Sequence, residues 1–133
     1  MQHASGPFDV KVTPQPADGY ADAATIGRMT LYKQFHGDLE ATSKGQMLTG
    51  MGSDKGSAGY VAVEQVSGTL HGRTGTFILM HTGVMNRGEP HLAIIVVPDS
   101  GTGELTGLSG TMSIDAGGGK HSYVFEYTLA TAS

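Results

Sequence analysis

Two ionisable side chains, Glu64 and His81, occur in segments whose other residues are mainly apolar. Alternation along a strand places Glu64 on one face with Tyr60. If that face lines an interior, loss of hydration would raise the pKa of the carboxyl group and prepare it to donate or accept a proton. The alternative is that Glu64 faces solvent while Val61 and Val63 form the core.

His81 is a second candidate, because alternation places it on one face with Phe77 and Leu79. If this face points inward, the imidazole could exchange protons near neutral pH, although a buried histidine can equally be neutral and hydrogen-bonded to a neighbour. Arg73 has the same parity further back in this segment. It could pair with Glu64 or extend to the rim of the fold.

Glu126 is a third candidate, set between Phe125 and Tyr127 near the end of the chain. It shares its own face with Val124 and Thr128, so the pattern allows it to point either inward or outward.

Together these residues predict proton transfer of the isomerase or lyase type, by C–H deprotonation in an apolar cavity. The predicted bases are Glu64, His81 and Glu126. The predicted substrate contacts are Tyr60, Arg73, Phe77, Leu79 and Tyr127. Six methionines beyond Met1 provide either ordinary core packing or an adaptable lining for a small apolar ligand. The alternative function is a non-catalytic barrel that binds hydrophobic ligands or has a structural role, and homo-oligomerisation stays open.

No cofactor or metal is predicted. The six histidines include no pair spaced i, i+2, which would put two imidazoles on one face of a strand. The runs 101–103 and 117–119 are glycine-rich, but neither precedes the helix that a phosphate site requires, so both are expected to be turns. The sequence contains no cysteine, which excludes thiolate chemistry and disulfides.

Composition narrows the class of protein. The 133 residues carry a net charge of −4, with no basic cluster to attract nucleic acid or a membrane surface. This length predicts one domain over residues 1–133. The first residues lack the basic and apolar run of a secretory signal, and no stretch is long enough to span a bilayer, so we expect a cytoplasmic protein.

The elements that must position these side chains are strands. Glycine is abundant, with 21 residues, and no segment has a sustained helical period. The apolar run 91–97 predicts a strand buried on both faces, and His3 is expected to lie in a disordered tail. Eight strands and no helix for crossovers predict an all-β fold, a single antiparallel eight-stranded β-barrel. The predicted strands cover residues 8–13, 28–35, 39–51, 58–66, 70–82, 91–97, 105–114 and 122–129.

Several segments together form a recognisable pattern. They are GPFDVKVT (6–13), FHGDL (35–39), GYVAVE (59–64), GTLHGR (68–73), Phe77 with His81, VVP (96–98), SGTG (100–103) and HSYVFEYTL (121–129). This pattern is similar to DUF3224, a bacterial family of unknown function whose members look like single barrels of the allene oxide cyclase type. The resemblance implies a cavity that could fold or deprotonate a small apolar substrate with an internal acid as base. It also implies that Glu64 and His81 belong to recurring segments.

Overall fold

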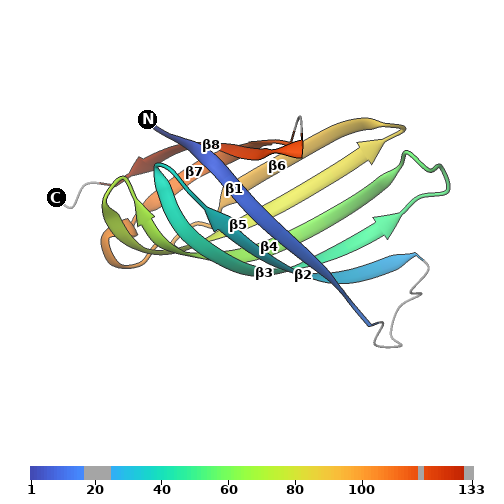
Figure 1. Cartoon of the computed structure of the whole chain (residues 1–133), viewed down its shortest axis with the longest axis horizontal. Helices are drawn as coiled ribbons and strands as arrows, with labels where there is room; N and C mark the ends of the chain where they lie inside the picture. The colour runs from blue at the N-terminus through green and yellow to red at the C-terminus, as the bar shows by residue number, and fades with distance from the viewer. Residues whose placement is uncertain (17–24, 117–118, 131–133) are drawn as a thin grey trace.

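Eight strands close into an antiparallel β-barrel in which each strand pairs with its sequence neighbours and β8 pairs with β1 (Figure 1). The computed structural model describes residues 1–16, 25–116 and 119–130. The predicted fold class is therefore confirmed. The elements are β1 (Gln2–Gln15), β2 (Ile26–Phe35), β3 (Leu39–Met51), β4 (Ala58–Leu70), β5 (Arg73–Asn86), β6 (Glu89–Val96), the short 3-10 helix η1 (Gly103–Leu105), β7 (Leu108–Asp115) and β8 (His121–Leu129).

The alternating pattern of β4 decides which residues face the interior. Ala62, Glu64 and Val66 are buried, whereas Val61 and Val63 between them are exposed. Since successive side chains of a strand point to opposite faces, this settles the choice left open by the sequence in favour of an inward-facing Glu64.

β1 is longer than predicted. It begins at Gln2 and pairs with β8 through residues 2–8, then with β2 through residues 8–15. The expectation that His3 lies in a disordered tail is wrong, because His3 is opposite Glu126 in this ladder. Pro14 does not end the strand. The later half of β1 pairs with β2 on one side and has no described neighbour on the other, and a proline without an N–H group is tolerated in such an edge position.

The expectation that residues 91–97 are buried on both faces is also wrong. Ile94 and Val96 are buried, whereas Ile95 on the outer face and Leu92 on the inner face are exposed. Leu92 is accessible because it lies where the barrel is open. The apolar run therefore belongs to a strand that is buried on its inner face only at Ile94 and Val96.

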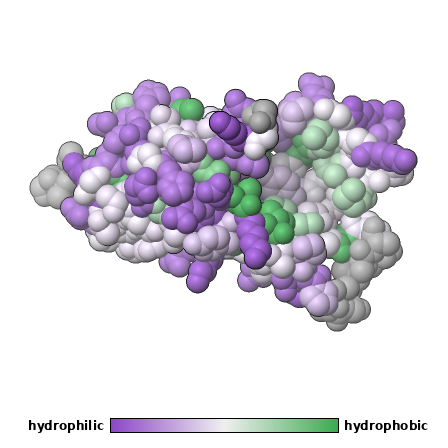
Figure 2. Space-filling view, in the orientation of Figure 1, coloured by the Kyte–Doolittle hydropathy of each residue, from purple (hydrophilic) through white to green (hydrophobic). Residues whose placement is uncertain are grey.

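The two ends of the barrel differ. One end is filled by large buried side chains, Phe35, Leu39, Leu70, Phe77, Leu105, Tyr123 and Phe125. At the other end, the β3–β4 and β5–β6 hairpins extend beyond β7 and β8 (Figure 1). Among the described residues, β6 pairs with β7 only at Ile94 and Ile95. The inner faces of the projecting strands therefore line a hollow, visible on the right of Figure 2 with apolar side chains along it.

The described part of the chain contains no helix with the length and apolar character that crossing a membrane would require.

Candidate functional site

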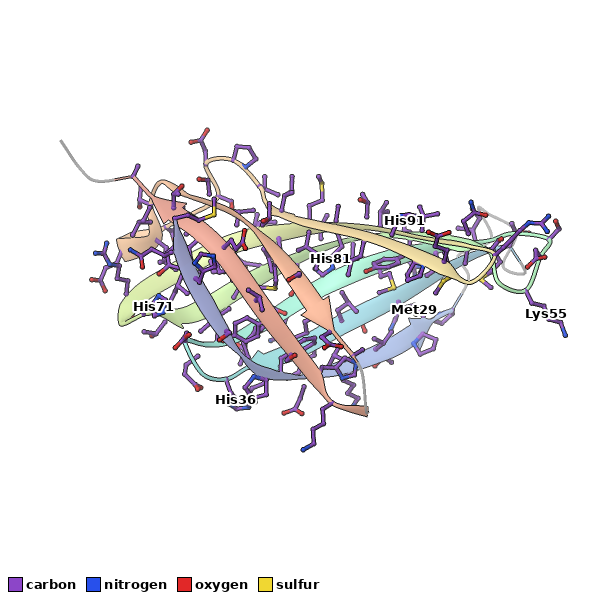
Figure 3. The ribbon with its side chains drawn as sticks, turned by 90° about the horizontal axis from the view of Figure 1, so that it is seen from above. Met29, His36, Lys55, His71, His81 and His91 are labelled. Atoms are coloured by element: carbon purple, nitrogen blue, oxygen red, sulfur yellow. The ribbon has the colours of Figure 1, made fainter. Side chains whose placement is uncertain are left out.

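Four polar side chains meet inside the barrel, between the packed end and the hollow. They are Lys33 on β2, Ser43 on β3, Glu64 on β4 and His81 on β5, and we call them the buried cluster. Their exposed fractions are 4%, 1%, 1% and 3%. Figure 3 places His81 about midway along the barrel, between the end marked by His71 and the end marked by Lys55.

Glu64 is the centre of the buried cluster, because the other three side chains all contact its carboxylate. Lys33 donates a hydrogen bond from Nζ to Oε2 at 2.9 Å, and Ser43 donates one from Oγ to Oε1 at 2.9 Å. His81 Nε2 lies 2.6 Å from Oε2. Nε2 forms this close contact with the carboxylate and has no hydrogen bond assigned to it among the described residues.

These contacts determine the charge of Glu64. Burial by itself would raise the pKa of the carboxyl group, but the contact with His81 and the charge of Lys33 outweigh it and lower the pKa to about 2. Glu64 is therefore an ionised carboxylate at neutral pH. The expectation of a raised pKa is wrong, because desolvation was considered without the two cationic or protonatable partners.

Lys33 was missed by the sequence interpretation, which assigned it no role. The ammonium group lies 5.6 Å from the centre of the Phe8 ring and 5.9 Å from that of Phe35. The faces of these rings supplement Glu64 in stabilising the charge. Strict alternation through Leu31, Lys33 and Phe35 is the signal that could have identified it.

Gly45 of β3 provides the space for Glu64. It is paired directly with Glu64, and a Cβ atom at this position would lie 2.3 Å from the Val63 carbonyl oxygen and 2.7 Å from Glu64 Cβ. No side chain larger than hydrogen fits without moving β4.

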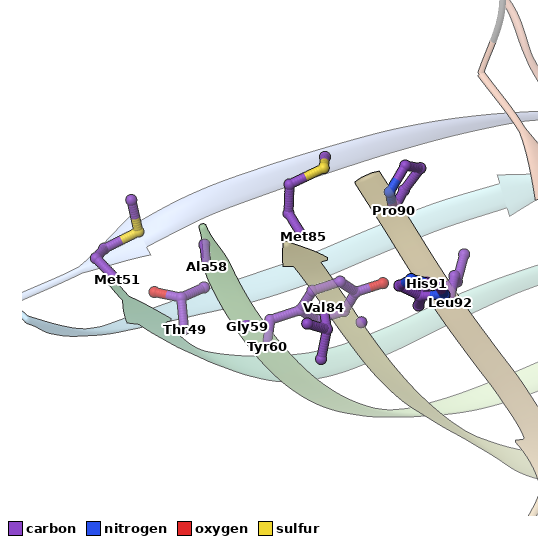
Figure 4. Close-up of a pocket in the computed structure, with 11 residues that line it drawn as sticks. Thr49, Met51, Ala58, Gly59, Tyr60, Val84, Met85, Pro90, His91 and Leu92 are labelled. Carbon is purple, nitrogen blue, oxygen red and sulfur yellow. The ribbon is translucent and has the colours of Figure 1, made fainter. Parts of the chain in front are cut away.

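Tyr60 connects the buried cluster with the hollow. Its ring lies against Gly83, where a Cβ atom would be 2.2 Å from the ring, and its centre is 6.5 Å from that of His81. Burial, with a smaller contribution from the charge of Glu64, raises the pKa of the Tyr60 phenol, so its hydroxyl stays protonated and can donate a hydrogen bond. Tyr60 also forms part of the wall of the hollow (Figure 4).

The hollow is a pocket of about 310 Å³ with a mainly apolar wall from the ends of β3 to β6. Its wall includes Met51, Ala58, Tyr60, Met85, Pro90 and Leu92. Figure 4 shows two of its methionines on different strands, Met51 on β3 and Met85 on β5. Flexible methionine side chains suit a site that adapts to the shape of an apolar ligand.

The structure brings together some of the predicted site residues. Glu64 and His81 are in contact, and Tyr60 lies beside them. Phe77 and Leu79 are fully buried on the inner face of β5, where Phe77 stacks on a phenylalanine of β8. They belong to the packed end and do not line the hollow.

Three predicted residues lie elsewhere. The Glu126 side chain is on the outer face, 47% exposed, with its carboxylate 3.5 Å from His3. Arg73 is exposed at the β4–β5 turn, which supports the rim interpretation rather than a pair with Glu64. Tyr127 is buried at the packed end, where its hydroxyl contacts His71.

Among the described residues, no three side chains of the histidine, cysteine, aspartate and glutamate types converge as a metal site would require. In the buried cluster, the positive charge beside the Glu64 carboxylate is the ammonium group of Lys33.

Comparison with known proteins places the chain in a family. A solved structure described as a protein of unknown function from the DUF3224 family, from Shewanella oneidensis MR-1, shares 50% sequence identity. The match covers 99% of this chain and 99% of that chain, with a TM-score of 0.92. No curated protein matches the chain. The family model described as "Protein of unknown function (DUF3224)" matches residues 4–127, so the chain belongs to the DUF3224 family.

Proposed function

We propose that this protein binds a small, mainly apolar molecule in the open end of the barrel and that His81 exchanges a proton with it. The observation that carries the proposal is the position of Tyr60, which lines the hollow while its ring centre lies 6.5 Å from that of His81. A ligand in the hollow would therefore contact the residue whose ring lies beside the His81 imidazole.

Apolar binding rests on the shape and chemistry of the hollow. Its volume of about 310 Å³ is at the lower end of the range for small-molecule sites, and its wall is apolar with few polar groups. The Tyr60 hydroxyl is a donor that could orient an oxygen atom of the ligand. Met51, Met85 and Leu92 contribute apolar contacts to the same wall.

His81 is a better base than Glu64 in this arrangement. A carboxylate with a pKa of about 2 is a weak proton acceptor, and all three neighbours of Glu64 already favour its ionised form. A proton taken up by His81 would place its positive charge 2.6 Å from Glu64 Oε2. Glu64 thus acts as a positioning residue that stabilises the imidazolium ion.

Non-catalytic binding is the second candidate, favoured by the burial of His81, which is 3% exposed. In that case the buried cluster orders the barrel interior and the hollow binds its ligand without turnover.

Kinetics with a nitrobenzisoxazole, whose ring opens on C–H deprotonation, distinguish the two candidates. We expect His81→Ala to reduce kcat/KM by a factor of about 100 or more, the usual contribution of a positioned general base. Glu64→Gln should lower the rate and shift its pH profile. Glu126→Gln is the matched control, because this exposed carboxylate lies on the outer face and should leave the rate unchanged.

Binding is measured separately with a fluorescent apolar probe. Saturable binding without turnover, or equal turnover by the native protein and His81→Ala, would remove the proton-transfer role and leave a binding barrel. Absence of saturable probe binding would contradict both candidates.

A further inference from the structure

A second pocket, of about 360 Å³, opens at the packed end of the barrel, far from the hollow. It lies where the start of β1, the β4–β5 turn and the end of β8 meet, at the end that His71 marks in Figure 3. Its wall is formed by Gln2, His71, Arg73, Tyr127 and Leu129. Two of these residues, Arg73 and Tyr127, were predicted from the sequence to bind substrate together, and the structure joins them here rather than beside Glu64.

Arg73 supplies this pocket with a positive charge that has no ion pair with any described residue. Its guanidinium group presents several N–H donors in a planar fork that matches a carboxylate. The carboxylates of Asp38 and Glu104 at this end each accept a hydrogen bond from a backbone N–H instead. An anion that enters the pocket would therefore meet an unpaired cation.

His71 fixes the direction of the Tyr127 hydroxyl. Its Nδ1 is hydrogen-bonded to that hydroxyl, and its Nε2 lies 3.8 Å from Asp38 Oδ2. Burial raises the pKa of the Tyr127 phenol. The charge of Arg73 acts in the opposite direction, and the charge of Asp38 raises the pKa further. Tyr127 therefore remains a neutral hydroxyl at neutral pH, hydrogen-bonded to an imidazole and near the charge of Arg73.

The backbone conformation of the β4–β5 turn does not by itself explain why residue 71 is a histidine. His71 and Gly72 both have positive φ, at 46° and 80°, as a two-residue hairpin turn of type I′ requires. Asparagine, aspartate and glycine are the residues that suit the first position of this turn. The side chain of His71 contributes contacts with Tyr127 and Asp38 that these smaller residues would not provide.

We propose that this second pocket binds a small organic molecule through its carboxylate group. Arg73 is the charged partner of the carboxylate. The Tyr127 hydroxyl donates to the carboxylate when it accepts its other hydrogen bond from His71 Nδ1. Leu129 and the Tyr127 ring form an apolar wall, which suits an organic carboxylate with an apolar body better than inorganic phosphate.

Calorimetric titration with benzoate tests this site, with benzamide as the uncharged analogue and inorganic phosphate as the alternative anion. We expect benzoate to bind and benzamide not to bind. Arg73→Gln should weaken benzoate binding on the order of tenfold or more, as expected when a charge-assisted hydrogen bond is removed. Tyr127→Phe should weaken it less, while thermal unfolding confirms that both variants fold.

Arg87→Gln is the matched control. Arg87 is another exposed arginine at a hairpin, in the β5–β6 turn at the opposite end of the barrel. It and His81→Ala should leave benzoate binding unchanged, which separates this proposal from the function of the hollow. The proposal is overturned if Arg73→Gln binds benzoate as the native protein does, if benzamide binds equally, or if only phosphate binds.

Discussion

At the scale of single residues, Lys33 and Glu64 form an ion pair that has almost no contact with solvent. Removing two charges from water is unfavourable, and their mutual attraction offsets this only when further polar contacts complete the site. Here Ser43 and His81 provide such contacts on the carboxylate side, and two aromatic rings do so around the ammonium group. Protonation of Glu64 would break this ion pair and should therefore lower the free energy of unfolding.

The first prediction concerns the loss of folding stability at low pH. The pKa of Glu64 is about 2 in the folded protein and 4.5 ordinarily, so the unfolded chain binds the extra proton first as pH falls. This contribution to stability is present above about pH 4.5 and is lost toward pH 2. It amounts to about 3 kcal/mol. Urea unfolding of the native protein between about pH 7 and pH 2.5 should show the loss.

The double variant Lys33→Met/Glu64→Gln is the reference, because all other carboxylates are the same in both proteins. Its stability should fall less steeply over the same pH range. Parallel curves for the two proteins would show that the pKa of Glu64 is not lowered in the fold.

Residue-level prediction from the sequence was partly successful. The alternation of β4 and β5 identified Glu64 and His81 as inward-facing candidates, and the structure places them in contact. It missed Lys33, because a lysine is ordinarily assigned to the surface. The direction of the Glu64 pKa shift could not be predicted, since it depends on partners from strands that are distant in the sequence.

At the scale of elements, two glycines of β3 differ in how closely the neighbouring strand approaches them. Gly45 and Gly50 lie on this same strand and neither has a positive φ, yet their surroundings differ. A Cβ atom at Gly45 would meet Val63 and Glu64, whereas nothing lies within 4 Å of one at Gly50.

The second prediction uses this contrast. Gly45→Ala should destabilise the barrel by about 1–3 kcal/mol, because the added methyl group forces β3 and β4 apart at the buried cluster. Gly50→Ala should have little effect or stabilise slightly, since alanine restricts the unfolded chain. Urea unfolding measures both. Equal effects would indicate that β3 and β4 adjust freely around Gly45.

Strand boundaries were predicted best where hairpin turns delimit them. The segment 39–51 coincides with β3, which lies between two turns. β1 was predicted too short, because its first half is defined by pairing with β8 at the other end of the chain. Such long-range pairing leaves no local signal in the residues before Phe8.

At the scale of the whole molecule, the ladder between β6 and β7 is the shortest in the described barrel. It contains the two pairs Ile94–Met112 and Ile95–Thr111, whereas every other ladder contains at least seven. Few backbone hydrogen bonds hold this seam, so local opening of the barrel should begin there.

The third prediction is that a disulfide across this seam stabilises the barrel. Ile95 and Thr111 are paired and exposed, and the chain has no cysteine that could interfere. The oxidised Ile95→Cys/Thr111→Cys variant should gain about 3 kcal/mol, as expected for a loop of this length. Amide exchange in β6 should slow relative to the reduced form. Unchanged exchange on oxidation would show that opening begins elsewhere.

The barrel as a whole was predictable from the number of strands, the turn residues and the absence of helix. Its asymmetry was not, because strand length and register together decide where β7 and β8 stop relative to the other strands. For that reason the sequence could not predict that Arg73 and Tyr127 lie at the packed end, away from Glu64.

The filled end has a kinetic consequence for the proposed chemistry. Phe77, Phe125 and Leu105 leave no passage through the barrel, so a molecule in the hollow enters and departs by the same mouth. A converted molecule must leave before the next one can reach Tyr60 and His81. Any turnover in this barrel should accordingly be inhibited by its own product in competition with the substrate.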